Sequence, residues 1–462
     1  MKRIVCLILV LFSTFAFSAK KSRFEQLELF NKVLFLVESQ YYREVDPEVL
    51  IQGAIKGMME TLDPHSSFLD KDIFKKMQEE TSGEFGGLGI EVSQKDGILY
   101  VVTPIDDTPA FKAGIKPRDK IVEIDNESTV GMTLEQAVKK MRGKPNSVIQ
   151  IGIVRDGVDG IKHYSIGRKI IKVRPVKSEL IQEEFAFLRL SQFQKNSAVS
   201  IRKALKKLNS LAAKNGGIKG IILDLRSNPG GLLDEAVEVS SIFLDQGVVV
   251  STEGRDPKNK EVRYVTKIGD KYLKMPLAIL INGASASASE IVAGALQDHN
   301  RGIVMGSRSF GKGSVQTVAK IDEENGLKLT IAQYMTPSGK KIQAIGIKPE
   351  VELDEVDAAW VEKHKSEDDP YIREADLKNH LVSVIETAEE KKNRLEKEKN
   401  EKIGRAKRLE QLKNERKTQN EGKKEDIFKK YNPKSDYQVL MAINLLKSFE
   451  VYQKFSSQKA SK

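Results

Sequence analysis

The sequence predicts a multidomain α/β protein that has helical segments at both ends. Within residues 217–313, short apolar runs alternate with segments of helical periodicity. The runs typical of buried strands cover residues 220–225, 276–281 and 302–305, and the helical segments cover residues 232–244 and 289–296. Because buried strands that alternate with helices are typical of a mostly parallel sheet, we expect an α/β layer in this part of the chain.

Both ends of the chain are predicted to be helical. Apolar residues recur at helical spacing over residues 24–62, and Asp63-Pro64 ends this segment. A final amphipathic helix is expected from Ser435 onwards. The stretch before it, residues 356–434, is rich in Lys, Glu, Arg and Asn, and we interpret it as a charged insertion to which the motifs assign no role.

A third region lies between the N-terminal helices and the α/β layer. It begins with a glycine cluster over residues 83–89. Alternating patterns then indicate strands at residues 89–92, 99–103, 120–124 and 148–154. One helix is predicted between the third and fourth of these strands. Its start is indicated by Thr133 and Gln136, which have the spacing of a capping box.

The composition excludes several kinds of chemistry. The chain has 462 residues, of which 40% are hydrophobic and 31% charged, as expected for a globular protein with a highly charged surface. Its only cysteine, Cys6, lies in an apolar run over residues 4–17 that has the layout of a secretory signal peptide. The mature chain then lacks thiols, which excludes cysteine catalysis, disulfides and cysteine-based metal sites. We expect an exported protein of the periplasm or cell envelope.

A serine-rich junction between a strand and a helix is the first candidate for catalysis. The sequence INGASASASE, residues 281–290, contains Ser285, Ser287 and Ser289 where a buried strand leads into a helix. The free N–H groups of a helix N-terminus favour an alkoxide and an oxyanion. The local sequence leaves all three serines open as nucleophiles, and it is also compatible with a plain helix cap.

Lys312 is the second candidate, because it lies between two glycines in GIVMGSRSFGKGSVQ, residues 302–316. A lysine acts as a general base only when it is neutral, so its pKa must fall well below the ordinary value of about 10.4. The stretch also matches the GxxxxGK of a P-loop and the S-x-x-K of penicillin-binding enzymes. Gly313 replaces the hydroxyl residue of the P-loop, and Gly311 and Gly313 disfavour the helical turn that S-x-x-K needs.

A histidine is the competing base. Among the five histidines, His299 is nearest in sequence to the serines, at the expected end of the helix that they begin. A helix rises about 1.5 Å per residue, which puts His299 roughly 15 Å or more from Ser287. A Ser-His-Asp triad is therefore disfavoured.

The sequence DLRSNPGGLL, residues 224–233, is the third element. It follows a predicted strand and turns the chain before a helix. The backbone N–H groups of Gly230 and Gly231 suit one half of an oxyanion hole, and the N–H of Ala288 suits the other half.

Taken together, these motifs resemble those of the carboxyl-terminal processing proteases, also called tail-specific proteases. The resemblance covers residues 24–355 and includes GMMETLDPHSSF, GEFGGLGIEV, DLRSNPGGLL, NGASASASE and RSFGKGSVQ in this order. The helix that begins near Ser435 also resembles the terminal helix of the family, whereas the charged insertion departs from the family pattern. The resemblance implies a protease core related to the crotonase and Clp peptidase folds, with an inserted PDZ domain.

The resemblance also implies roles for individual residues. It selects Ser287, the middle serine, as the nucleophile and Lys312 as the general base. Gln316 matches the glutamine that hydrogen-bonds the lysine and holds it in position. Asp298 matches a position with a supporting role, which we interpret as structural.

A second functional loop is implied in the PDZ region. Gly87, Leu88, Gly89 and Ile90 match the loop that binds a substrate's C-terminal carboxylate through backbone N–H groups. The bound peptide would then add as a strand beside residues 89–92.

The expected organisation follows from these assignments. Its regions are a signal peptide (1–19), an N-terminal helical segment (20–80), a PDZ domain (84–170), an α/β protease core with a cap (171–355), the charged insertion (356–434) and a C-terminal helix (435–462). The implied activity is that of an exported, ATP-independent serine endopeptidase that recognises substrate C-termini and uses no cofactor and no metal.

Two other functions are compatible with such a fold. An inactive PDZ scaffold is disfavoured because Ser287, Lys312 and Gln316 are all present, and an acyl-CoA enzyme of the crotonase fold is disfavoured by the export signal and the PDZ domain. We expect protein or peptide substrates with exposed C-termini, a homodimer or higher homo-oligomer, an adaptor protein and peripheral association with the envelope. Acidic residues are interleaved with basic ones despite the net charge of +11, so nucleic acid is not an expected partner.

Overall fold

The computed structural model describes residues 22–256, 258, 260–354, 372–377, 379–381 and 431–460. The expected signal peptide and most of the expected charged insertion lie outside the described residues. The chain divides into two compact units, Met1–Leu62 and Asp63–Lys462. Within the described ranges, every helix is too short or too polar to span a lipid bilayer.

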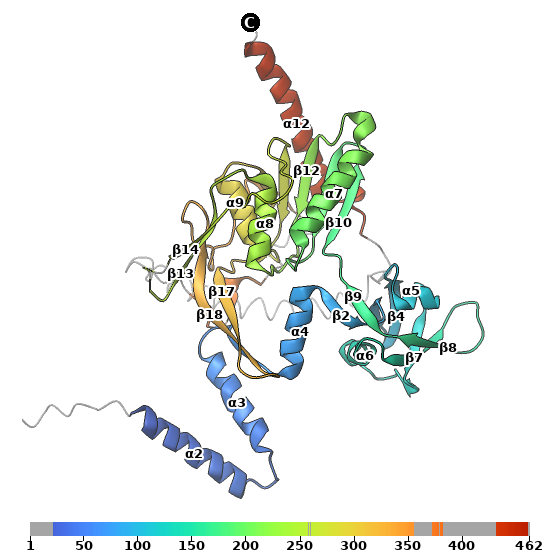
Figure 1. Ribbon diagram of the computed structural model, residues 1–462, viewed down its shortest axis with the longest axis vertical. Helices are drawn as coiled ribbons and strands as arrows, with labels where there is room; N and C mark the ends of the chain where they lie inside the picture. The colour runs from blue at the N-terminus through green and yellow to red at the C-terminus, as the bar shows by residue number, and fades with distance from the viewer. Residues whose placement is uncertain are drawn as a thin grey trace, which may run out of the picture. The chain divides into compact units, whose positions relative to one another are not determined.

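Two helices form the described part of the first unit, namely α2 (Arg23–Gln40) and α3 (Pro47–Glu60) (Figure 1). The helical character expected for residues 24–62 is confirmed, with a break between the two helices. Helix α2 begins at a capping box, in which Ser22 Oγ accepts from the Glu25 N–H and the Glu25 carboxylate accepts from the Ser22 N–H. Apolar side chains of α2 are exposed to solvent, for example Phe24 at 81%.

The second unit contains a small β-rich region that coincides with the expected PDZ domain. Its main sheet has the order β3-β4-β5-β7-β8, with β6 paired to β5. The elements are β2 (Glu84–Gly87), β3 (Ile90–Lys95), β4 (Ile98–Pro104), α5 (Pro109–Ala113), β5 (Lys120–Ile124), β6 (Glu127–Ser128), α6 (Leu134–Met141), β7 (Val148–Val154), β8 (Lys162–Gly167) and β9 (Lys169–Lys172). The entry strand β2 pairs with the exit strand β9, so both connections to the rest of the chain lie side by side.

An α/β layer forms the main body of the second unit (Figure 1). Its sheet has the order β10-β11-β12-β15-β16-β19, in which only β10 runs antiparallel to its neighbour. The strands are β10 (Val176–Ile181), β11 (Phe185–Leu190), β12 (Gly220–Asp224), β15 (Leu277–Ile281), β16 (Ile303–Gly306) and β19 (Val351–Glu352). The mostly parallel sheet expected from the alternating apolar runs is confirmed.

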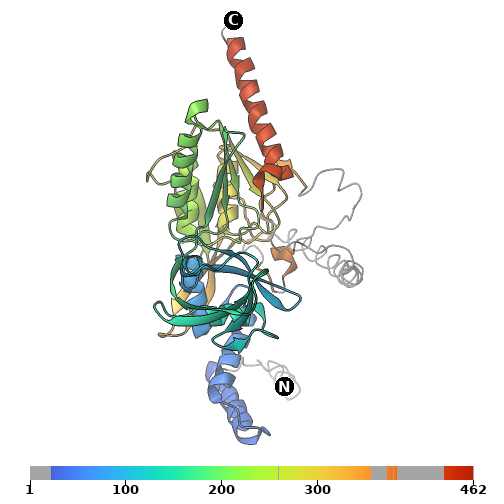
Figure 2. The same ribbon diagram turned by 90° about the vertical axis from the view of Figure 1, so that its right-hand side faces the viewer.

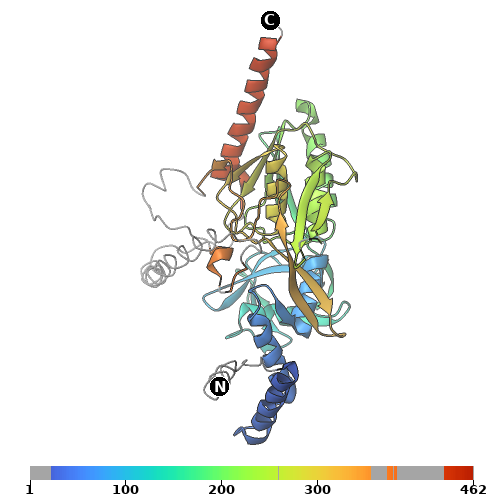
Figure 3. The ribbon, with the colours of Figure 1, turned by 90° about the vertical axis from the view of Figure 1, so that its left-hand side faces the viewer.

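Helices cover both faces of this sheet. On one face lie α7 (Ser197–Leu211), α8 (Leu233–Phe243) and α9 (Ala288–Asp298), which share one buried cluster with the strands. On the other face α12 (Tyr437–Ala460) packs through a second cluster. The views from the two sides show α12 opposite the other three helices (Figures 2 and 3). The expected C-terminal helix is therefore an integral part of the layer.

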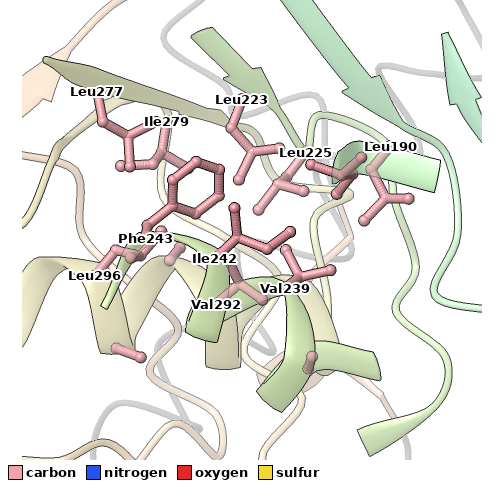
Figure 4. Close-up of a cluster of buried hydrophobic side chains, with 14 of the residues drawn as sticks. Leu190, Leu223, Leu225, Val239, Ile242, Phe243, Leu277, Ile279, Val292 and Leu296 are labelled. Atoms are coloured by element: carbon pink, nitrogen blue, oxygen red, sulfur yellow. The ribbon is translucent and has the colours of Figure 1, made fainter. Parts of the chain in front are cut away.

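The larger cluster fixes the position of α9 beneath the sheet (Figure 4). Phe243 of α8, Ile279 of β15 and Leu296 of α9 are fully buried in it. Complete burial of one such side chain contributes about 1.5–3 kcal/mol to folding. The end of β15 and the start of α9, between which the serine-rich junction lies, are thus held by the core.

A second sheet is built from strands that precede and interrupt those of the α/β sheet along the chain. Its order is β1-β18-β13-β14, and β17 pairs with β18. The elements are β1 (Ser67–Leu69), the following helix α4 (Lys71–Ser82), β13 (Val248–Gly254), β14 (Lys260–Tyr264), β17 (Ser314–Lys320) and β18 (Gly326–Met335). Residues after Lys312 form the strand β17, whereas a P-loop would continue into a helix.

A buried ionic network attaches α12 to the sheet. The Arg226 guanidinium donates to both carboxylate oxygens of Asp224 at 2.9 Å. It also donates to Asp436 Oδ1 at 3.1 Å and to Gln438 Oε1 at 2.9 Å, at the start of α12. Asp224 is fully buried and Arg226 nearly so. The network therefore joins the C-terminal helix to the turn that carries Gly230.

Replacing Arg226 by alanine should be strongly destabilising. Among the described residues, Arg226→Ala leaves the buried Asp224 carboxylate with only Arg189, at 3.6 Å, as a cation. We expect the free energy of unfolding to fall by about 3–5 kcal/mol, as for other buried ion pairs that lose one partner. Urea unfolding of the purified protein measures this change.

An exposed ion pair supplies the control. Arg263 pairs with Glu261 at the surface, where such pairs contribute about 0–1 kcal/mol. Arg263→Ala should therefore leave the unfolding curve almost unchanged. Equal and small losses in both variants would contradict the role of Arg226.

Candidate active site

The serine-rich junction forms a strained turn. The buried strand β15 ends at Ile281, and α9 begins at Ala288 directly after Ser287. Ser287 has φ 54° and ψ −112°, a backbone conformation that is rare for residues other than glycine. Strain of this kind concentrates at functional sites, where the surrounding structure enforces it.

The three candidate serines have different surroundings. Ser285 and Ser289 are fully buried. The Ser285 hydroxyl donates to the Leu225 carbonyl at 2.8 Å, and the Ser289 hydroxyl donates to the Asn228 carbonyl at 2.9 Å. Ser287 is partly exposed. Among the three, only Ser287 is accessible to a substrate, which favours the serine that the resemblance selected.

Glu290 joins two segments of the site. One is the turn between β15 and α9, residues 282–287, which we call the serine turn, and the other is the loop between β16 and β17, residues 307–313, which we call the lysine loop. Its Oε2 accepts from the Ser287 N–H at 2.7 Å and from the Lys312 N–H at 2.9 Å. Its Oε1 accepts from the Ser309 hydroxyl at 2.5 Å and from the Gly311 N–H at 2.7 Å. Glu290 is fully buried. Burial raises the pKa of Glu290 to about 7, while the four donated hydrogen bonds oppose this rise.

Lys312 lies in an environment that favours its neutral form. Burial lowers the pKa of Lys312, and the nearby Lys328 ammonium lowers it further. The carboxylates of Glu374, Glu290 and Asp63 act in the opposite direction, and the net pKa is below the ordinary value. A lysine of this kind can act as a base at lower pH than an exposed one.

Gln316 does not hold Lys312 in this structure. Its side-chain amide donates to Ser314 Oγ at 2.8 Å and to Thr330 Oγ1 at 3.4 Å. Among the described residues, no hydrogen bond joins the Gln316 amide to Lys312. The expected contact between these two side chains therefore requires a rearrangement of Gln316.

The glycine turn after β12 lies against the serine turn. A Cβ atom on Gly230 would be 2.8 Å from Ser287 Cβ and 3.0 Å from the nitrogen of Ala288. With φ 103°, this position combines a left-handed backbone with a close approach that only glycine permits. The structure thus brings together all three residues that were expected to form the oxyanion hole.

The amides of this group are not equally available. The Gly230 N–H donates to Asn228 Oδ1 at 2.9 Å. Contrary to the expectation, it is therefore not available as an oxyanion donor in this structure. Within the described chain, the N–H groups of Gly231 and Ala288 donate no hydrogen bond. Gly230 supplies close packing, and the two free donors are those of Gly231 and Ala288.

Asp298 and His299 lie at the far end of α9. Asp298 accepts from the Ser338 N–H at 2.9 Å and from the Lys340 ammonium at 3.1 Å, so it stabilises a turn, in agreement with a structural role. The His299 ring nitrogen Nε2 hydrogen-bonds the Val248 carbonyl at 2.7 Å. His299 ends the helix that Ser287 begins, which agrees with its exclusion as the base.

The expected carboxylate-binding loop lies between β2 and β3. Gly89 has φ 78°, and a Cβ atom there would be 2.4 Å from Thr108 Cβ, so the turn requires glycine. The Leu88 and Gly89 carbonyls accept from the backbone N–H groups of Ala110 and Ile105. In the part of the chain that the structure describes, the N–H groups of Leu88 and Gly89 donate no hydrogen bond. Two free donors on a rigid turn can bind a carboxylate.

Glu290 is the functional residue that the sequence reasoning missed. A signal was present, because Ser287 and Glu290 have the S-x-x-E spacing of a capping box. That spacing predicts the contact between Glu290 and the Ser287 N–H. It does not predict the contacts to the lysine loop, which lies more than 18 residues further along the chain.

Known families match the sequence in three consecutive stretches. Residues 14–73 match the activating protease CtpB N-terminal domain, residues 86–160 match the PDZ domain, and residues 184–353 match peptidase family S41.

Individual relatives match over most of the chain. The carboxy-terminal-processing protease of Bartonella bacilliformis is 43% identical over 82% of this chain and 86% of the relative. The carboxy-terminal processing protease CtpA of Bacillus subtilis is 37% identical over 74% of this chain and 71% of the relative. A solved structure of the photosystem II D1 C-terminal processing protease is 28% identical, covers 72% of this chain and 87% of that chain, and has a TM-score of 0.43.

The fold and these matches define a serine protease that consists of an α/β protease core and a PDZ domain. The chain belongs to the carboxy-terminal-processing proteases of peptidase family S41. The resemblance found in the sequence motifs is thereby confirmed.

Glu290→Gln tests whether the carboxylate holds the active-site backbone. In this variant an NH₂ group, which is itself a donor, replaces one acceptor oxygen of Glu290. Two of the four groups that donate to Glu290 then lose their acceptor in a buried site. We expect the free energy of unfolding to fall by about 2–4 kcal/mol, the cost of leaving such groups unpaired. We also expect kcat to fall by about tenfold to a hundredfold, because small displacements of catalytic groups have effects of this size. Urea unfolding and steady-state kinetics measure both.

Glu350 offers a matched control, since its exposed carboxylate also accepts a backbone N–H, that of Val304, at 2.8 Å. Glu350→Gln should leave kcat unchanged. If Glu290→Gln keeps the wild-type kcat and stability, Glu290 does not hold the site.

Proposed function

We propose that this protease is an ATP-independent endopeptidase in which Ser287 is the nucleophile, Lys312 the general base and Gln316 the residue that orients Lys312. Neutral Lys312 takes the proton from the Ser287 hydroxyl as Oγ attacks the scissile carbonyl carbon. The oxyanion accepts hydrogen bonds from the N–H groups of Gly231 and Ala288. When the peptide bond breaks, the leaving amine takes the proton from Lys312 and an acyl-enzyme remains.

The second half of the reaction repeats these steps with water. Lys312 removes a proton from a water molecule, whose oxygen attacks the acyl carbonyl. The ester bond to Ser287 breaks, and its Oγ takes the proton back from Lys312. The acid product leaves and the enzyme is restored.

One observation carries this proposal. The backbone N–H groups of Ser287 and Lys312 both donate to a single oxygen atom, Glu290 Oε2. The backbones of Ser287 and Lys312 therefore lie close together although 25 positions separate them in the sequence, which supports pairing these two residues as nucleophile and base. The partial exposure of Ser287 and the lowered pKa of Lys312 agree with the assigned roles.

The PDZ domain is proposed to select the substrate. The free N–H groups of Leu88 and Gly89 bind the C-terminal carboxylate of an unstructured or hydrophobic chain end, and Gly87 and Ile90 flank this turn. The peptide adds as a strand beside β3 and leads to Ser287. In this proposal Gln316 leaves Ser314 and turns to Lys312 when the substrate is bound.

Export and assembly complete the proposal. The apolar run over residues 4–17 supports a signal peptide and a periplasmic or envelope location. The exposed apolar side chains of α2, among them Phe24 and Phe35, support a homo-oligomer or an adaptor as the group that covers them.

A proteolysis assay tests the catalytic assignment. Purified wild-type protein should degrade an unfolded test protein, whereas Ser287→Ala and Lys312→Ala should reduce kcat by about a thousandfold or more, as for other catalytic nucleophiles and bases. Ser210→Ala and Lys320→Ala, at exposed positions on α7 and β17, serve as matched controls and should keep full activity. Wild-type cleavage that is no faster than that of the two site variants would refute the proposal.

Substrate amidation tests the role of the PDZ loop. A substrate whose C-terminal carboxylate is converted to an amide loses its charge, and charge-assisted hydrogen bonds contribute about 1.5–3 kcal/mol. We expect KM to rise by about tenfold to a hundredfold while kcat changes little. Equal KM values for the acid and the amide would contradict carboxylate binding by Leu88 and Gly89.

A further inference from the structure

Part of the charged insertion packs against the loop that carries Lys312. The described residues 372–377 and 379–381 belong to this insertion. The Arg373 guanidinium donates to the carbonyl oxygens of Arg308 and Ser309 at 2.9 and 2.8 Å. The Glu374 N–H donates to the Phe310 carbonyl at 3.1 Å. The segment therefore binds the three residues of the loop that lie just before Gly311 and Lys312.

The Glu374 side chain continues this contact beyond Lys312. It is completely buried and accepts from Gln343 Nε2 at 2.8 Å. The other end of the Gln343 amide, Oε1, accepts from the Gly313 N–H at 2.9 Å. Glu374 thus fixes the orientation of the Gln343 amide, and through it the backbone immediately after Lys312.

His65 is the second partner of Glu374. Its Nε2 lies 2.7 and 2.9 Å from the two oxygens of the Glu374 carboxylate. His65 follows Asp63, whose carboxylate is bonded to Ser66 and to Thr330 of β18, beside the strand that follows Lys312. A buried carboxylate is costly unless its hydrogen bonds are made, so His65 and Gln343 stabilise Glu374 in its buried position.

Two buried carboxylates therefore hold the lysine loop from two sides. Glu290 of α9 accepts from the N–H groups of Gly311 and Lys312. Glu374 of the insertion acts on the N–H of Gly313 through Gln343. The backbone from Gly311 to Gly313, where glycines give little restraint of their own, is fixed at three successive N–H groups.

We propose that Glu374 is a positioning residue for Lys312, and that the charged insertion supplies it to the active site by docking residues 372–377 and 379–381 onto the lysine loop. This inference rests on the proposed function, in which Lys312 is the general base. It gives the insertion a role in the reaction, although the sequence motifs assigned it none.

The charge of Glu374 also acts on Lys312. Among the described residues, the charged groups that act on the pKa of Lys312 include Lys328, Glu374, Glu290 and Asp63, and the three carboxylates favour the ammonium form. Removing the charge at position 374 should therefore lower the pKa of Lys312, because only the two other carboxylates remain to oppose burial and Lys328. The acid limb of the kcat/KM profile, which rises as Lys312 loses its proton, should then move to lower pH.

Two substitutions in the full-length protein separate geometry from charge. Glu374→Ala removes the contacts to His65 and Gln343, and we expect kcat to fall by about tenfold to a hundredfold with little change in KM. Glu374→Gln can keep one hydrogen bond to each partner, and we expect kcat within about threefold of wild type together with an acid limb at lower pH. A purely structural role would not move the acid limb.

A double-mutant cycle tests the pair. His65→Ala should reduce kcat in the same direction as Glu374→Ala but by less, because it leaves the contact between Glu374 and Gln343 in place. The double variant should be little worse than Glu374→Ala alone, since both substitutions remove the contact between His65 and Glu374. Glu352→Gln removes an exposed carboxylate and should change neither kcat nor the pH profile. Thermal unfolding of each variant identifies a loss of fold, and Glu374→Gln remains informative if Glu374→Ala unfolds.

The outcomes distinguish this inference from the proposed function. If Lys312→Ala is as active as wild type, the proposed function fails. If Lys312→Ala is inactive but the Glu374 variants keep both the wild-type kcat and the wild-type acid limb, only the positioning role is overturned.

Discussion

The site depends on one buried carboxylate that accepts four hydrogen bonds. Glu290 lies in the first turn of α9 and binds the N–H groups of Ser287, Gly311 and Lys312 and the hydroxyl of Ser309. Removal of a carboxylate from water is costly, and the four donors offset this cost only while both segments are in place. The serine turn and the lysine loop are consequently fixed as one group. The strained backbone of Ser287 is one consequence, because this group enforces its conformation.

The fold brings these segments together through its sheet topology. The strands β12, β15 and β16 are neighbours and run parallel, so their carboxyl ends meet at one edge. The glycine turn follows β12, Ser287 follows β15 and Lys312 follows β16. Functional groups of open α/β sheets gather at this edge. Helix α12 is attached at this edge through Arg226, and the strand β17 begins directly after the loop that carries Lys312.

Most of the fold could be predicted from the sequence, since the apolar runs of β12, β15 and β16 are continuous and short. The motifs and their order also identified the family. The choice among the three serines could not be made from local sequence, because the hydroxyls of Ser285 and Ser289 are hydrogen-bonded to carbonyl groups about 60 positions away in the sequence. The use of the Gly230 N–H by Asn228 is a detail of turn geometry that spacing does not reveal. The contact between His65 and Glu374 spans 309 positions and joins a recognised motif to a segment without one. The catalytic roles themselves stay predictions.

The central claim is that Lys312 is held as a base with a lowered pKa beside Ser287. Competitive labelling with an amine-acylating reagent, read by mass spectrometry across a pH series, measures the titration of this one side chain in the wild-type protein. The account predicts a midpoint below the ordinary lysine pKa of about 10.4, because burial and Lys328 outweigh the surrounding carboxylates. A midpoint at or above the ordinary value would contradict it, since Lys312 would then remain an ammonium ion at the pH where the protease works.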